Sequence, residues 1–226
     1  MTRSIGASKD FVRESDSADH VHIVLEGWAY RYKLTRDGRR QIVALLIPGD
    51  TANPDTILLK SRGYGLRTLT PVKVLSMPRE RLLVLAEKHP GIAKTIAWLA
   101  MIDSATLSQL AVCLGRRSAK QRIAHLLCEL SERLRSGDDT FEMPLTQEVI
   151  ADTLGLTSVH VNRTLQLLRS EGLIEPGKRV MTITDADALC RLGDFDPDYL
   201  HDPRAGSTGS DAAMGFEQSN SGLRAS

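Results

Sequence analysis

Hydrophobic residues recur at every second position over much of the first third of the chain. The segments with this pattern or with a short apolar run are 21–25, 28–34, 41–47 and 66–77. A period of two is typical of β-strands with one buried face. Asp37-Gly38 supplies a hairpin turn between two of them, because glycine readily adopts positive φ angles. The pattern predicts an antiparallel, jelly-roll-like β-roll over residues 1–88, with a polar and frayed segment at residues 1–10.

The apolar period changes to three or four residues at His89-Pro90. The positions with this spacing are Ile92, Ile96, Leu99, Ile102, Thr106, Leu110 and Cys113. They predict one long helix over residues 89–114. The apolar stripe is narrow, as in a coiled-coil seam, which favours pairing with the same helix of a second copy and predicts a dimerisation helix. The alternative is that this helix packs on its own β-roll.

Residues 146–174 have the pattern of two short helices joined by a tight turn. Thr146 is placed to cap the first helix, and Gly155 supplies the left-handed residue at which that helix ends. Thr157 is placed to cap the second helix. Apolar residues at helical spacing predict the buried face of the second helix, namely Val161, Leu165 and Leu168.

The other face of the second helix carries side chains that form hydrogen bonds. These are Ser158, His160, Asn162, Arg163, Gln166 and Arg169. Such a face suits the base edges and phosphates of a DNA major groove, so the pair of helices reads as a helix-turn-helix. Two amphipathic helices around a glycine also occur in domains that do not bind nucleic acid, and the pair alone leaves both interpretations open.

The segment after the second helix favours DNA. Two short extended stretches, residues 172–174 and 180–183, flank a turn at 175–179. This turn carries Lys178 and Arg179. A β-hairpin wing beside a recognition helix touches backbone phosphate. We therefore predict a winged helix-turn-helix over residues 115–200.

The predicted DNA contacts fall into two groups. The base readers are Ser158, His160, Asn162 and Arg163, and the remaining DNA-binding residues are Thr146, Gln147, Thr157, Arg169, Lys178 and Arg179. Thr146 and Gln147 are expected to anchor a phosphate at a helix N-terminus. The three cations of the second group are expected to hold the DNA backbone.

The rest of this domain is also patterned. Ser118 and Gln121 form a capping box at the start of an amphipathic helix, and residues 184–192 predict a last short helix. Residues 201–226 are rich in glycine, serine and alanine, a composition that predicts a disordered tail. The fold class is therefore α+β, with a β-roll, a long helix and a winged helix-turn-helix.

Composition adds limits rather than a function. The 226 residues carry a net charge of +1, so attraction to DNA must come from a local cationic face rather than from the total charge. We expect no apolar segment with the length and hydropathy needed to span a bilayer and no signal peptide, and hence no membrane partner. The three cysteines, Cys113, Cys128 and Cys190, are widely spaced, which favours reduced thiols in a cytoplasmic protein.

The order of these motifs resembles the CRP/FNR family of bacterial transcription regulators. The resemblance rests on LEG at 25–27, DGRRQI at 37–42, PGD at 48–50 and the block LTQEVIADTLGLTSVHVNRTLQLLRSEGLI at 145–174. It covers roughly residues 9–195. It implies an effector-sensing β-roll, a homodimer bound to palindromic promoter DNA, RNA polymerase as a partner, and a regulator rather than an enzyme.

The resemblance also bears on which bases are read. Arg163 matches the family's core recognition arginine, whereas Ser158 and Val159 stand where many members have Arg-Glu or a similar polar pair. Loss of that glutamate removes an acceptor for a cytosine amino group. The half-site need not be the family's familiar one, and His160 and Asn162 are candidates for part of the readout.

Three departures concern the effector. The cyclic-nucleotide branch has a Gly-Glu loop and an Arg-Ser or Arg-Thr pair; here Gly-Glu is missing and Gly63 follows Arg62, the weak candidate for the effector arginine. Cyclic AMP is therefore not expected. No cysteine precedes Cys113, so an iron–sulfur cluster is not expected either. The helix and first strand usual at the front of the roll are expected to be missing, which makes the roll N-terminally short.

One motif in the roll suggests a different class of protein. His20, His22 and Glu26 have the H-x-H-x3-E spacing of metal-binding cupins, and two imidazoles with a carboxylate suit a divalent ion. The alternative function is thus a metal-binding β-roll protein or enzyme with an accessory helical domain. No histidine follows Pro48-Gly49, where a cupin supplies its last ligand. We therefore prefer two half-exposed strand histidines, with no metal site and no catalytic residues.

Overall fold

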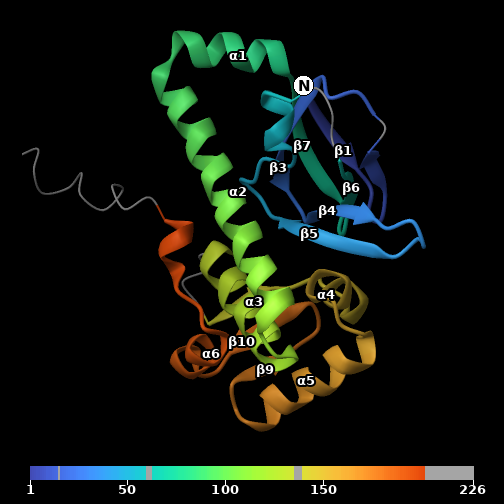
Figure 1. Ribbon diagram of the computed structural model, residues 1–226, viewed down its shortest axis with the longest axis vertical. Helices are drawn as coiled ribbons and strands as arrows, with labels where there is room; N and C mark the ends of the chain where they lie inside the picture. Colours follow the sequence, from blue (N-terminus) through green and yellow to red (C-terminus); the bar gives the residue numbers. More distant parts are fainter. Residues whose placement is uncertain (15, 60–62, 135–138, 202–226) are drawn as a thin grey trace, which may run out of the picture.

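The computed structural model describes residues 1–14, 16–59, 63–134 and 139–201. A β-roll forms one half of the molecule and a mainly helical domain the other, and the long helix α2 runs alongside both (Figure 1). The prediction of an α+β fold with these three parts is confirmed. The predicted disordered tail falls almost entirely outside the described residues, as does Arg62.

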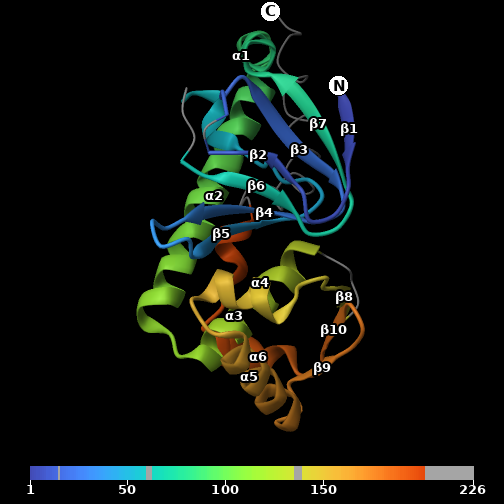
Figure 2. The same cartoon turned by 90° about the vertical axis from the view of Figure 1, so that its right-hand side faces the viewer.

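Two antiparallel sheets form the roll (Figure 2). The three-stranded sheet has the order β1 (Thr2–Ile5), β7 (Val72–Pro78), β3 (His20–Glu26), and the four-stranded sheet has the order β2 (Asp10–Val12), β6 (Gly65–Thr68), β4 (Ala29–Leu34), β5 (Arg40–Leu46). Alternate side chains of both sheets meet in an apolar core that includes Val24, Leu46, Leu66 and Val74. The predicted turn at Asp37-Gly38 is present, with Gly38 at a φ of 82°.

Two details of the roll differ from the sequence prediction. Residues 1–10 are not frayed: β1 pairs with β7 along its whole length, and the N-terminal ammonium of Met1 donates to the Ser76 carbonyl at 2.9 Å. This strand shows no alternation of buried and exposed side chains, because only Ile5 is buried. Its backbone hydrogen bonds to β7 keep it in the sheet instead. The segment 66–77 does give two strands, but β6 and β7 belong to different sheets.

Two short helices were not predicted. The 3₁₀ turn Pro54–Ile57 follows β5, and α1 (Arg79–Lys88) follows β7. Helix α1 has no buried residue, and its apolar residues form one continuous run, residues 82–85, rather than a stripe at helical spacing from which a helix could be predicted.

Helix α2 (Pro90–Arg116) directs the part of the predicted apolar stripe from Leu99 to Cys113 toward its own protomer. Leu99, Ile102 and Thr106 line a cavity with residues of the roll, and Leu110 and Cys113 line a second cavity with α3 and α4. The alternative of packing on the chain's own domains holds for these five residues, and the dimerisation helix stays a prediction. A heptad-like period does not identify the partner, because a helix docked on its own domain needs the same spacing.

The opposite face of α2 carries a second set of residues at spacings of three and four. We call this set the exposed stripe: the exposed Lys94, Trp98, Met101, Ser108 and Val112 together with the half-buried Ala105. Trp98, Met101 and Val112 are 38%, 65% and 43% exposed. Apolar residues on both faces give α2 the length and hydropathy of a membrane-spanning helix, with a mean hydropathy of 1.4. The expectation that no segment has these properties is therefore wrong, although Asp103 within α2 forms an ion pair with Arg31 of the roll.

The helical domain packs four helices on a small sheet. Its elements are α3 (Ala119–Leu134), β8 (Thr140–Glu142), α4 (Gln147–Leu154), α5 (Ser158–Ser170), β9 (Ile174–Pro176), β10 (Val180–Ile183), α6 (Ala186–Gly193) and a 3₁₀ turn at Pro197–Leu200. The predicted capping box is present, with the Ser118 amide donating to Gln121 Oε1 at 3.0 Å. One cluster of buried apolar residues joins α3 to the roll and includes Ile42, Leu45 and Leu127.

Close packing of α6 on α3 depends on Gly193. A Cβ atom at this position would lie 2.6 Å from the backbone nitrogen of His125 and 2.9 Å from its Cα. These are backbone atoms in the middle of a helix, so they cannot move aside locally.

We expect Gly193→Ala to lower the free energy of unfolding by about 1–3 kcal/mol through this overpacking. The measurement is the urea unfolding midpoint followed by circular dichroism. The control is Gly91→Ala, where an added Cβ meets nothing within 4 Å and alanine favours the helix. Equal midpoints for Gly193→Ala and the wild type would contradict the close approach of α6 to α3.

Candidate nucleic-acid interface

Helices α4 and α5 form the predicted helix-turn-helix. Thr146 Oγ1 accepts from the Val149 amide and Thr157 Oγ1 from the His160 amide, each at 3.2 Å. Gly155 between the helices is left-handed, with a φ of 62°. Both caps and the turn are as the sequence predicted, because each satisfies backbone groups that a helix end leaves unpaired.

Helix α5 has one buried and one exposed face. Val161, Thr164, Leu165 and Leu168 are buried, and Figures 1 and 2 place α5 at the end of the molecule away from the roll. The four predicted base readers are all exposed. Amide, imidazole and guanidinium groups on an exposed helix can donate to and accept from the edges of bases in a major groove.

Strands β9 and β10 form the predicted wing, residues 174–183. Lys178 and Arg179 lie between the strands and are exposed, and Arg179 has a left-handed φ of 63°. Strand β8, which was not predicted from the sequence, pairs with the other side of β10. β8 has three residues and a single buried side chain, too little for an alternation to show.

Two of the arginines predicted to contact phosphate form ion pairs with neighbouring glutamates. Arg169 pairs with Glu175 at 2.6 Å, and Arg179 lies 3.6 Å from a carboxylate oxygen of Glu142. Both pairs are about half exposed, so solvent screens them and each is worth little. Either arginine can exchange its carboxylate for a DNA phosphate at small cost.

The comparisons with known proteins agree with this geometry. A model described as "Crp-like helix-turn-helix domain" matches residues 121–192, and one described as "Cyclic nucleotide-binding domain" matches residues 2–89. The chain is 30% identical over 205 residues to the transcriptional activator protein FnrL of Cereibacter sphaeroides, covering 87% of this chain and 82% of that protein. The chain belongs to the CRP/FNR family.

Other members of the CRP/FNR family give the same result. The nitrogen fixation regulation protein FixK of Bradyrhizobium diazoefficiens is 34% identical over 164 residues, covering 71% of this chain and 68% of that protein. The structure of FixK2 from Bradyrhizobium japonicum superposes with a TM-score of 0.79 at 26% identity, covering 85% of this chain and 96% of that one. The protein is a DNA-binding transcription regulator and not an enzyme.

The cupin-like motif does not form a site. His20 is exposed on β3, and Glu26 pairs with Lys73 at 3.1 Å. Within the described part of the chain, no three side chains among histidine, cysteine, aspartate and glutamate come together as metal ligands. The alternative of a metal-binding enzyme is thus set aside in favour of a CRP/FNR regulator.

A direct contact between the roll and the helix-turn-helix was not predicted from the sequence. Arg40 at the start of β5 donates from Nε to Asp152 of α4 at 2.7 Å, and Gln41 Nε2 donates to the Thr153 carbonyl at 3.0 Å. Each pair is separated by 112 residues. No periodicity or local motif reports a contact over such a distance.

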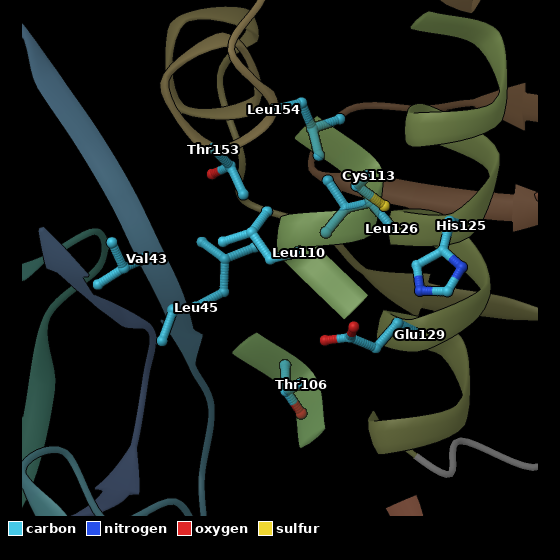
Figure 3. A pocket seen from close by; sticks show the side chains of 11 residues that line it. Val43, Leu45, Thr106, Leu110, Cys113, His125, Leu126, Glu129, Thr153 and Leu154 are labelled. Atoms are coloured by element: carbon cyan, nitrogen blue, oxygen red, sulfur yellow. The ribbon is translucent and has the colours of Figure 1, made fainter. Parts of the chain in front are cut away.

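A cavity of about 40 Å³ lies where this contact meets α2 and α3. Figure 3 shows Val43 and Leu45 of β5 on one side and His125 of α3 on the other. His125 is 2% exposed and its Nδ1 lies 3.1 Å from the Gly193 carbonyl. A carbonyl only accepts, so Nδ1 carries the proton. Nε2 has no hydrogen-bond partner within the described ranges.

Burial lowers the pKa of His125, and the nearby Arg117 guanidinium lowers it further. The fold therefore favours the neutral form of this imidazole. The unfolded chain binds a proton with a pKa of about 6.5. Below that pH the unfolded state carries more protons than the folded state, so the free energy of unfolding falls as the pH is lowered.

We expect His125→Asn to remove this pH dependence, because an amide can still donate to the Gly193 carbonyl but does not titrate. The measurement is urea unfolding between pH 7.5 and pH 5. The wild type should lose more stability over this range than the variant, whose other histidines are unchanged. Parallel loss of stability in both proteins would show that His125 titrates normally in the folded state.

Proposed function

We propose that this regulator is a homodimer that reads a palindromic promoter site with one copy of α5 in each half-site. The observation that carries the proposal is the exposed stripe of α2, which lies opposite the face that packs on the protomer's own domains. Large apolar side chains in one line along a helix favour a second helix as their cover. A second copy supplies an identical stripe, and a two-fold axis along α2 places two recognition helices on one side of the dimer.

Each half-site is read by the exposed face of α5. Ser158, His160, Asn162 and Arg163 are the proposed base readers, with Arg163 suited to the two acceptors of a guanine. The helix N-termini at Thr146, Gln147 and Thr157 and the cations Arg169, Lys178 and Arg179 are the proposed phosphate contacts. Their common exposure supports this division of roles.

The sensing function belongs to the roll, and its effector is not cyclic AMP in this proposal. The cavity between the roll and α2 measures about 60 Å³, whereas ligand pockets have roughly 300–1,000 Å³. Arg31 and Asp103 form a bidentate ion pair at its wall, with distances of 2.9 Å and 2.6 Å. An effector of a different and smaller kind is compatible with this space.

We also propose function without an iron–sulfur cluster. The three cysteines lie on α2, α3 and α6, Cys113 Sγ accepts from Arg117, and the thiols of Cys128 and Cys190 contact each other at 3.0 Å. Several relatives are named transcriptional activators, which supports RNA polymerase as a partner and the cytoplasm as the location.

The first test is selection of DNA from a random pool by the purified protein. We expect an enriched palindrome with half-sites about one helical turn apart. Arg163→Ala should weaken binding to the selected site by about 1–3 kcal/mol and relax the preference at one base pair per half-site. Arg13→Ala, an exposed arginine of the roll, is the control. Weak, salt-sensitive binding without enrichment would contradict sequence-specific recognition.

The second test concerns the dimer. Met101→Glu places a charge in the middle of the exposed stripe, and we expect it to shift the protein from dimer to monomer in analytical ultracentrifugation, because an unpaired charge at an apolar interface is costly. Thr95→Glu adds the same charge at an exposed position of α2 outside the stripe and should leave the dimer intact. A Met101→Glu protein that remains dimeric would place the interface elsewhere.

A further inference from the structure

Val159 is an apolar side chain at an unusual place. It is the second residue of α5 and is 62% exposed. The other exposed large apolar side chains of the described helical domain, Leu167 and Val180, are 46% and 39% exposed. No described part of the chain covers Val159, and it takes no part in the core of the domain.

The geometry of the helix groups Val159 with the polar reading face. Side chains three and four residues apart lie on one face of a helix, so Val159, Asn162, Arg163 and Gln166 are neighbours. The buried residues of α5, among them Val161 and Leu165, point away from this face. Val159 is thus a single apolar element among groups that form hydrogen bonds.

A valine is well suited to present methyl groups. Its branched Cβ leaves one strongly preferred rotamer in a helix, so little side-chain entropy is lost when a partner covers it. The major groove offers one apolar group to such a side chain, the C5-methyl of thymine. The exposed groups of the other bases are donors and acceptors, which a valine cannot satisfy.

We propose that Val159 packs against the C5-methyl group of a thymine in each half-site and thereby determines specificity at that base pair. The inference rests on the proposed function in one respect, namely that α5 enters the major groove. Val159 and Arg163 are one turn apart, roughly 6 Å along the helix. Base pairs rise about 3.4 Å each, so the thymine lies within about two base pairs of the base that Arg163 reads.

The test replaces single thymines of the selected site by uracil, which lacks only the methyl group. Loss of one buried methyl corresponds to about fourfold weaker binding. We expect this loss for one thymine position per half-site and about fifteenfold for both half-sites together. Uracil at the other thymines should have no effect. At the sensitive position, 5-methylcytosine should bind more tightly than cytosine.

The protein side of the test uses Val159→Ala and Val159→Thr. Val159→Ala should bind the thymine and uracil sites equally, which is the signature of a direct contact in a double-mutant cycle. Val159→Thr keeps one γ-methyl and should retain part of the discrimination. Val159 is exposed, so the unfolding midpoints of both variants should match the wild type, which separates loss of contact from loss of fold.

The outcomes distinguish this inference from the proposed function. If a palindrome is enriched but uracil is tolerated at every position, or costs the same in Val159→Ala as in the wild type, the thymine contact is overturned and the regulator remains. If no sequence is enriched and Arg163→Ala has no effect, the proposed mode of DNA reading fails and the thymine contact with it.

Discussion

Two arginines at the domain junction orient the DNA-binding domain on the roll. Arg133 of α3 is 15% exposed and reaches Asp50 at 2.5 Å and the Leu45 carbonyl at 3.2 Å, while Arg40 of β5 reaches α4. A buried guanidinium is tolerated only where carboxylates and carbonyls meet its donors in the right directions. The apolar cluster shared by the two domains stabilises their contact, but apolar packing is not directional and does not by itself set the angle between the domains. The directional hydrogen bonds of the two arginines therefore set the orientation of the helical domain relative to the roll.

The same junction connects the roll to the reading helices by two routes. One runs through α2, which lines both cavities at the junction, and the other runs from β5 directly to α4. Thr106 of α2 borders both cavities. The side chain of this residue therefore contacts space shared with the roll and space shared with the helical domain. The arrangement suits a regulator, since small shifts at a packed junction alter the position of a whole domain.

Much of the architecture follows from local sequence signals. Period-two segments gave most of the strands, Thr146, Gly155 and Thr157 fixed the helix-turn-helix, and Asp37-Gly38 located a hairpin, because each of these features is determined by residues close in sequence. The predicted DNA-binding residues are all exposed, and their roles remain predictions. Features that depend on residues far apart in the sequence were not predicted, among them the pairing of β1 with β7 and the contact of Arg40 with Asp152. The stripe of α2 shows the limit most clearly, since its spacing predicted the helix correctly but did not show that residues 99–113 pack on the chain's own domains.

The exposed stripe of helix α2 also links the concentration of the protein to the balance between monomer and proposed dimer. With apolar residues on both faces, the isolated protomer keeps Trp98, Met101 and Val112 in contact with water, and only association removes them from it. In the proposed dimer, stability and assembly then rise together with protein concentration. Newly made chains at low abundance are the species most exposed to proteolysis and to wrong partners. Synthesis rate would act on this regulator as a threshold, below which protomers are cleared and above which dimers accumulate.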